Sequence, residues 1–204
     1  MSTERFPLDR RQVFGLAGAG LLGLALSACS QDDPLAKQAR AGDNKNYVAG
    51  DGSVTEFAPD QRKAAKDFQG VLFDGKRVTS KDLEGKVVVM NFWFAACAPC
   101  RVEAPDLKAM HTEFAPKGVE FYGVNLRDEK ATAEAFEKNF GITYPSFNDK
   151  DGQVLLSVSG LVPPGAVPTT LIFDRKGRVS ARILGQLEKG TLKTLIASAL
   201  AERA

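Results

Sequence analysis

Histidine, cysteine and net charge are all scarce in this chain of 204 residues. Its single histidine, His111, excludes a metal site built from several histidines and any mechanism that needs two imidazoles. Three cysteines are too few for a disulfide-stapled scaffold. The 27 basic residues barely exceed the 25 acidic residues, so the chain lacks the basic excess of most nucleic-acid-binding proteins. We therefore expect no nucleic acid among its partners.

Long apolar runs are missing as well. Residues 13–28 carry no charge, but this run is shorter than the ~20 residues that comfortably span a bilayer as a helix. Arg10 and Arg11 precede the run and small residues end it, which is the pattern of a twin-arginine secretory signal. We expect residues 1–28 to be a signal peptide rather than a membrane span.

Cys29 directly follows this run, after Leu26-Ser27-Ala28. The order resembles the bacterial lipobox, in which the cysteine is lipidated and becomes the first residue of the mature chain. A lipid at Cys29 would hold the protein on the extracytoplasmic face of the cell membrane. The alternative is an unmodified cysteine beside an ordinary cleavage site.

Residues 29–64 are polar and contain few large apolar side chains. Such a composition cannot bury enough apolar surface to order itself, and it predicts a flexible tether. The alternative is that the part after Tyr47 packs as an irregular arm on the domain that follows.

Residues 65–204 alternate between strand and helix patterns, which predicts a single α/β domain with a central mixed sheet. The clearest signal is the apolar run VVVMNFWF over 87–94, typical of a central strand buried on both faces. The other predicted elements are a hairpin over 71–78, a helical turn from Ser80, helices over 99–115, 130–140, 154–161 and 191–201, and strands over 119–124, 144–147, 169–174 and 179–184.

The chemistry of the domain is predicted to lie in Cys97-Ala98-Pro99-Cys100, between the buried strand and the next helix. Unpaired backbone N–H groups at the helix start favour a thiolate at Cys97 and lower its pKa. Cys100, one turn further in, is expected to be more buried and to stay protonated until it is needed. This arrangement suits exchange through a mixed disulfide, in which Cys97 attacks and Cys100 resolves.

Two other interpretations of the cysteine pair are weaker. A zinc site needs about four ligands, and the chain offers too few once Cys29 is lipidated. A structural disulfide across two residues closes a very short loop and constrains the unfolded chain little. The sequence predicts no metal and no cofactor.

Residues 91–105, NFWFAACAPCRVEAP, resemble the active-site segment of the thioredoxin superfamily. They most resemble its TlpA-like branch of membrane-anchored, extracytoplasmic thiol-disulfide oxidoreductases, and the likeness covers roughly residues 65–203. The resemblance implies a thioredoxin-like fold with an N-terminal hairpin and an inserted strand–helix segment at about 126–148. It also implies client proteins with thiols or disulfides as substrates, and a membrane redox partner.

The same resemblance assigns further site residues. Val167-Pro168-Thr169 is similar to the family's cis-proline loop, which implies that Pro168 is cis, faces the cysteines and lets the Val167 backbone bind substrate. Glu103 is implied to handle the proton of Cys100, the alternative being a solvated charge on the helix. Trp93, the only tryptophan, is expected to pack under the active site, with substrate contact as the second interpretation.

The leading hypothesis is a lipid-anchored thiol-disulfide oxidoreductase that reduces client proteins, for example apocytochrome c before haem attachment. The first alternative is an oxidant that forms disulfides in exported proteins. A peroxiredoxin-type peroxidase and a copper-delivery protein are two further alternatives. The copper interpretation is disfavoured because no histidine follows His111.

Overall fold

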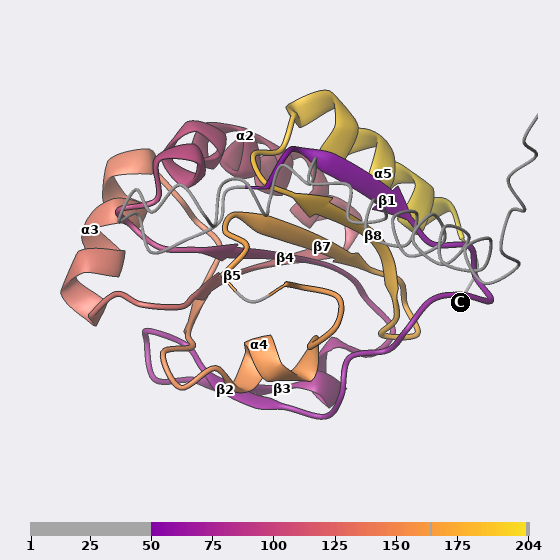
Figure 1. Ribbon diagram of the computed structural model, residues 1–204, viewed down its shortest axis with the longest axis horizontal. Coiled ribbons are helices and arrows are strands. Elements are labelled where there is room, and N and C mark those ends of the chain that lie inside the picture. The colour runs from indigo at the N-terminus through magenta and orange to yellow at the C-terminus, as the bar shows by residue number, and fades with distance from the viewer. Residues whose placement is uncertain (1–49, 164, 203–204) are drawn as a thin grey trace, which may run out of the picture.

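A six-stranded mixed sheet forms the centre of the computed structural model, which describes residues 50–163 and 165–202 (Figure 1). Strands β4, β5 and β6 are parallel, whereas β7, β8 and β1 continue the sheet in antiparallel pairs. This confirms the predicted mixed α/β class. In spatial order the strands are β1 (Ser53–Glu56), β8 (Val179–Leu184), β7 (Thr169–Phe173), β4 (Val87–Trp93), β5 (Val119–Asn125) and β6 (Ser146–Asn148).

Helices and a hairpin cover the two faces of the sheet (Figure 1). One face carries the long helices α2 (Ala98–Phe114), α3 (Lys130–Phe140) and α5 (Lys189–Ala201). The other carries the hairpin of β2 (Gln69–Val71) and β3 (Arg77–Thr79), the 3-10 turn η1 (Ser80–Leu83) and the short helix α4 (Gln153–Ser157). A second 3-10 turn, η2 (Ala115–Lys117), links α2 to β5.

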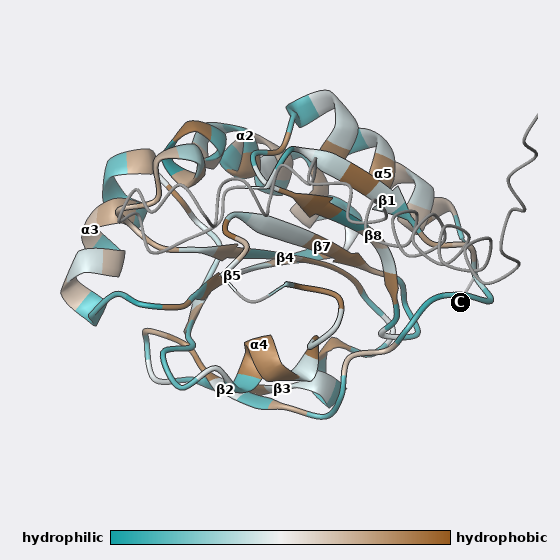
Figure 2. Cartoon of the chain, viewed as in Figure 1, coloured by the Kyte–Doolittle hydropathy of each residue, from teal (hydrophilic) through white to brown (hydrophobic). Residues whose placement is uncertain are grey.

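Strand β4 is buried along its whole length, as its apolar run predicts. Because side chains alternate along a strand, Val87 and Val89 join the apolar cluster under α2 and α5. Val88, Met90 and Phe92 join the cluster on the side of the hairpin and α4, whose hydrophobic residues are visible in Figure 2. The strand therefore holds both layers together and ends directly before the cysteine pair.

The tether predicted over 29–64 is wrong for the part that the structure describes. Residues 53–56 form the edge strand β1, which pairs with β8 in the register Ser53↔Leu184 to Glu56↔Ala181. Most of this strand is exposed, so its stability comes from backbone pairing rather than from side-chain burial. The alternative of an arm packed on the domain is closer, although the arm contains a regular strand.

The remaining predicted elements lie close to their expected ranges. Helix α3 matches 130–140, and with β6 it forms the inserted segment. The helix predicted over 154–161 is shorter and ends at Ser157, since the chain turns through Gly160, whose φ is 87°. Positive φ favours glycine and is incompatible with continuing a right-handed helix.

Several predictions concern residues outside the described ranges. The signal peptide over 1–28, the lipid at Cys29 and the first part of the tether lie there. None of the helices in the described part of the chain has both the length and the apolar character needed to cross a bilayer.

Candidate active site

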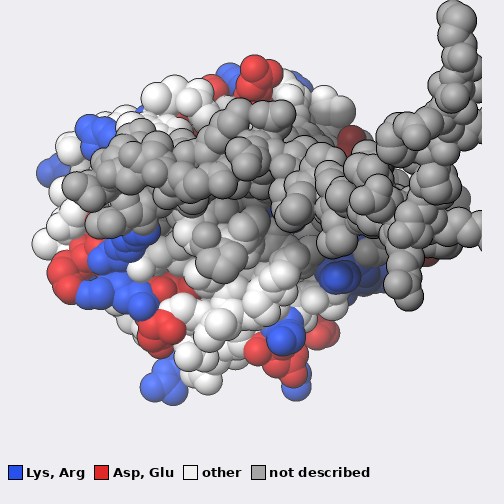
Figure 3. Space-filling view, viewed as in Figure 1, with Lys and Arg blue, Asp and Glu red and all other residues white. Residues whose placement is uncertain are grey.

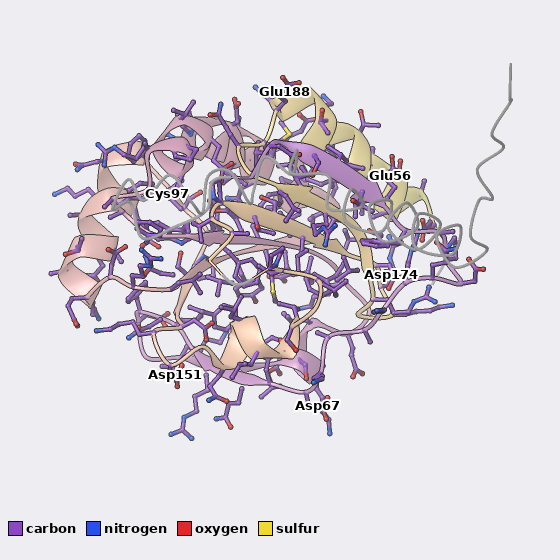
Figure 4. The ribbon with its side chains drawn as sticks, in the orientation of Figure 1. Glu56, Asp67, Cys97, Asp151, Asp174 and Glu188 are labelled. Atoms are coloured by element: carbon purple, nitrogen blue, oxygen red, sulfur yellow. A yellow bond between two sulfur atoms is a disulfide. The ribbon has the colours of Figure 1, made fainter. Side chains whose placement is uncertain are left out.

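Cys97 and Cys100 form a disulfide at the start of α2, with their Cα atoms 5.3 Å apart. Cys97 is the N-cap of the helix, and its sulfur accepts a hydrogen bond from the Cys100 backbone N–H at 3.2 Å. Pro99 lies in the first helical turn, where the N–H that it lacks would have no intrahelical partner. The predicted placement of the pair at a helix N-terminus is confirmed, and Cys97 lies at the α2 end of the sheet in Figure 4.

The expected difference in burial between the two cysteines is not found. Cys97 is 0% exposed and Cys100 is 2% exposed. Both belong to a buried cluster with Trp93, Phe94 and Val167. The two cysteines thus differ in position along the helix and in hydrogen bonding, but not in exposure.

The Val167–Pro168 peptide bond is cis, as the resemblance implies. Val167 belongs to the same buried cluster as both cysteines, so this loop faces the disulfide. The loop is fixed at its ends by two hydrogen bonds. Thr169 Oγ1 donates to the Ala166 carbonyl at 2.8 Å, and the Gly185 N–H donates to the Pro168 carbonyl at 2.8 Å.

Glu103 is only 1% exposed, so the alternative of a solvated helix charge is wrong. Its carboxyl accepts hydrogen bonds from Asn91 Nδ2 at 2.7 Å and from the Leu187 backbone N–H at 3.0 Å. Burial raises the pKa of Glu103 to about 8, although these two hydrogen bonds oppose the rise. A carboxyl with such a pKa exchanges protons near neutral pH, three residues from Cys100 on the same helix.

Trp93 and His111 are both packed against aromatic rings. The Trp93 indole is 4% exposed and stacks on Phe136 with ring centroids 4.5 Å apart, beneath the cysteines. Its contact with a substrate stays a prediction. His111 packs edge-on against Phe121 and Tyr144, hydrogen-bonds Thr143 at 2.9 Å, and has its pKa lowered by burial.

Asp128 is a site residue that the sequence reasoning missed. Its Oδ2 accepts the Ala95 N–H at 2.6 Å, two residues before Cys97, and also the Asn125 side-chain amide at 2.8 Å. Asn125 Oδ1 in turn accepts the Asp128 N–H at 2.8 Å. This clamp fixes the loop that carries Cys97. Only its local half had a signal in the sequence, the spacing Asn125-x-x-Asp128 at the end of a strand, since short polar side chains there cap turns, whereas the bond to Ala95 had none.

Two aromatic rings beside the cysteine loop carry guanidinium groups. Arg127 lies over Phe94, 4.4 Å from the ring centroid, and Arg101 lies over Phe140 at 5.2 Å. Elsewhere on the face shown in Figure 3, acidic and basic side chains are interspersed. The two arginines place positive charge near the disulfide.

A helix that begins at a cysteine pair, opposite a cis-proline loop, defines a thiol-disulfide oxidoreductase with a thioredoxin-like fold. Residues 62–182 match the AhpC/TSA family, and the chain belongs to that family.

The curated relatives are enzymes of the ResA type. The chain is 31% identical over 131 residues to the thiol-disulfide oxidoreductase ResA of Bacillus thuringiensis (strain Al Hakam). This alignment covers 64% of this chain and 73% of the relative. It is 34% identical over 129 residues to ResA of Geobacillus thermodenitrificans (strain NG80-2), covering 63% and 72%. The protein is therefore a ResA-type thiol-disulfide oxidoreductase.

Solved structures agree with this assignment. A secreted thiol-disulfide isomerase from Corynebacterium glutamicum aligns with a TM-score of 0.66 and 27% identity, over 77% of this chain and 98% of that one. A DsbF homologue from Corynebacterium diphtheriae aligns with a TM-score of 0.63 and 30% identity, over 73% and 94%.

Proposed function

We propose that this oxidoreductase is a reductant on the extracytoplasmic side of a membrane, where a lipid on Cys29 anchors it. Its substrates are disulfides in client proteins, for example apocytochrome c before haem attachment, and a membrane redox partner supplies its electrons. The observation that carries the proposal is the redox-active pair at the start of α2 with a buried, protonatable Glu103 on the same helix.

The reduction begins at Cys97. In the dithiol form, the helix start and the Cys100 N–H stabilise a thiolate on Cys97. This thiolate attacks a client disulfide, a bond forms between Cys97 and the client, and the other client sulfur leaves as a thiolate. The product is a mixed disulfide on Cys97.

Cys100 completes the reaction. The ionised form of Glu103, which its pKa of about 8 makes accessible near neutral pH, takes the proton of the Cys100 thiol, and the resulting thiolate attacks the sulfur of Cys97. The bond between Cys97 and the client breaks, the Cys97–Cys100 disulfide forms, and the client leaves fully reduced. Two electrons pass to the client, and the dithiol of the membrane partner restores them by the reverse exchange. Val167, beside the cis proline, is positioned to bind the extended client backbone.

Trapping tests the two cysteine roles. In the full chain, Cys100→Ala should accumulate a mixed disulfide between Cys97 and client proteins, visible on a non-reducing gel. Cys97→Ala is the matched control and should trap none. Trapping by Cys97→Ala instead of Cys100→Ala would reverse the roles.

The redox potential tests the direction. A reductant should equilibrate with a glutathione buffer at a potential near that of thioredoxin, about −270 mV, and far from the −120 mV of the oxidant DsbA. A value near that of DsbA would support the oxidant alternative. Hydrogen peroxide consumption by the dithiol form, at a rate that exceeds client reduction, would support the peroxidase alternative.

Fractionation tests the anchor. The full chain should sediment with membranes and incorporate labelled palmitate, and Cys29→Ser should lose both properties. Membrane association that persists without Cys29 would contradict lipid anchoring.

A further inference from the structure

A small cavity of mixed polar and apolar lining lies beside Cys100. It measures about 10 Å³, about the room that one water molecule needs. Polar atoms reach it from Asn91, Trp93, Tyr144 and Ser146, and the rest of its lining is Cys100 with the apolar side chains of Ala104, Leu107, Phe136 and Ile142. One of these residues, Asn91, is also the hydrogen-bond donor to Glu103. The cavity therefore connects the surroundings of the resolving cysteine with those of the buried carboxyl.

Two buried polar atoms near this cavity have no hydrogen-bond partner in the described part of the chain. They are Ser146 Oγ and Glu137 Oε1, which lie close enough to each other that the Ser146 hydroxyl lowers the pKa of Glu137, and neither atom has another partner there. A Cβ atom at Gly123 would lie 2.2 Å from Ser146 Oγ and 2.6 Å from Trp93 Nε1, so glycine leaves room for both polar atoms. Because buried polar groups are nearly always partnered by protein or by ordered water, Ser146 and Trp93 are suited to hold one water.

Tyr144 lines the cavity and senses the charges of both Glu103 and Glu137. Burial raises the pKa of Tyr144, and the negative charges of Glu103 and Glu137 raise it further, so the phenol stays protonated. Glu137 is half-buried on α3 and thus reaches solvent. Burial raises the pKa of Glu137, and the Ser146 hydroxyl opposes this rise. A chain of protonatable groups thus leads from Glu103 to the surface.

We use the name rear relay for Tyr144 and Ser146, which line this cavity, together with Glu103, which is bonded to the lining residue Asn91, and Glu137, which interacts with Ser146. We propose that the rear relay, with one water in the cavity, exchanges the proton of Cys100 with solvent while a client protein covers Cys97. The inference rests on the proposed function. When Cys100 attacks the mixed disulfide, its proton passes to Glu103, onward through Tyr144 and the water, and out at Glu137. When the enzyme is reduced again, one proton returns along the same route to the Cys100 thiolate.

Other charged groups face the relay and set its pH range. Asp106 on α2 acts on Glu103, and Glu134 on α3 acts on Glu137. Both charges raise the pKa of the carboxyl that they face. His111 packs against the Tyr144 ring, and burial lowers its pKa, which favours the neutral imidazole near neutral pH.

The decisive experiment separates the two steps of exchange in the full chain. Trp93, the only tryptophan, lies in the cluster with both cysteines and reports each step by stopped-flow fluorescence. We expect Glu137→Gln to slow the Cys100-dependent second step about tenfold at pH 7. This is less than the ~10²–10⁴-fold that a side chain in direct proton transfer with the reacting group contributes, because Glu137 acts only at the far end of the relay. Formation of the mixed disulfide by Cys97 should keep its wild-type rate. The matched control is Glu134→Gln, an exposed carboxyl on the same helix that pairs with Lys130. It should keep the first step and the maximal rate of the second step, and should only shift the pH dependence of the second step downward, because the Glu134 charge raises the pKa of Glu137.

A second variant guards against a folding defect. Tyr144→Phe removes only the hydroxyl, so the thermal unfolding midpoint should change little. The rate of the second step should, however, lose its dependence on pH around pH 7. If Glu137→Gln and Tyr144→Phe both keep the wild-type rate and pH profile of the second step, the relay is wrong although the proposed function stands. If the wild-type chain reduces no disulfide at all, the proposed function itself fails.

Discussion

Two buried carboxylates lie near opposite ends of β4, and they have different partners. Asp174, next to the Val88 end, receives hydrogen bonds from the guanidinium groups of Arg62 at 3.1 Å and Arg178 at 2.8 Å (Figure 4). Glu103, next to Asn91 at the cysteine end, has only neutral donors.

The difference in partners reverses the direction of the pKa shift. Burial alone would raise the pKa of Asp174, but the hydrogen bonds from Arg178 and Arg62 lower it below its ordinary value. Burial dominates at Glu103 and raises its pKa to about 8. A cationic partner makes a buried carboxylate a permanent charge that supports the fold, whereas neutral partners leave a carboxyl that exchanges its proton.

The largest effect expected from breaking this contrast is on stability. Asp174→Ala leaves the buried Arg62 guanidinium with the partly exposed carboxylate of Glu202 and the Phe57 carbonyl as its partners in the described part of the chain. Loss of one member of a buried ion pair costs about 3–5 kcal/mol, and we expect the free energy of unfolding in urea to fall by that amount. Disulfide exchange per folded molecule should stay unchanged, because Asp174 lies far from the cysteines. A matching loss of activity in the fully folded variant would contradict the separation of the two ends.

The second effect concerns pH. The pKa of Glu103 rises from 4.5 to about 8 on folding, so between these values the folded protein holds a proton that the unfolded chain releases. The free energy of unfolding must therefore fall as pH rises through this window, with a slope approaching ~1.4 kcal/mol per pH unit. Asp174 has the opposite sign, and its contribution is lost only in acid as the pH falls through its lowered pKa.

Glu103→Gln sharpens the contrast because it removes only the first of these two dependences. Urea titrations at pH 5, 6, 7 and 8 should show a flatter stability profile for the variant than for the wild-type protein. The loss of stability below pH 4 should remain in both. An unchanged slope between pH 5 and 8 would mean that Glu103 is ionised in the folded state.

Sequence reasoning succeeded where the signal is local. The run over 87–94 and the cysteine spacing each specify their structure within a few residues, and α3 was predicted with its observed ends. Strand β1 was missed because its partner β8 lies more than a hundred residues away and its side chains are mostly exposed. The Asp128 clamp needs the loop after β5 to meet the loop after β4, which no local pattern states.

The burial of Glu103 had a signal that was overlooked. Leu107, Met110 and Phe114 form the buried face of α2, and Glu103 precedes Leu107 by four residues, so it lies on the same face. A charged residue that lies in line with the apolar face of a helix is either buried together with that face or marks the point where the apolar face stops. The sequence alone leaves these two outcomes open, since the donors Asn91 and Leu187 come from other elements.

The third prediction tests the neutral donor directly. Asn91→Ala removes the hydrogen bond to Glu103 and the 3.1 Å bond to Thr170, which should cost ~1–3 kcal/mol in the free energy of unfolding. Because the Asn91 hydrogen bond lowers the pKa of Glu103, its loss should also move the upper end of the pH window upward. Thr170→Val is the matched control, since it keeps the donor to Glu103 and should leave that window in place. An equal shift in both variants would assign the effect to packing.

The smallest effect is expected at an exposed pair. Lys193 and Glu113 are joined at 2.8 Å, as close as Arg178 and Asp174, but both side chains are accessible to solvent. Water and salt screen such a pair, so Lys193→Ala should leave the thermal midpoint unchanged within error, at low and at high salt. If this variant were destabilised as strongly as Asp174→Ala, then pairing alone would stabilise carboxylates in this fold. Burial would then no longer account for the contrast between Asp174 and Glu103, and the protonatable state of Glu103 would need another cause.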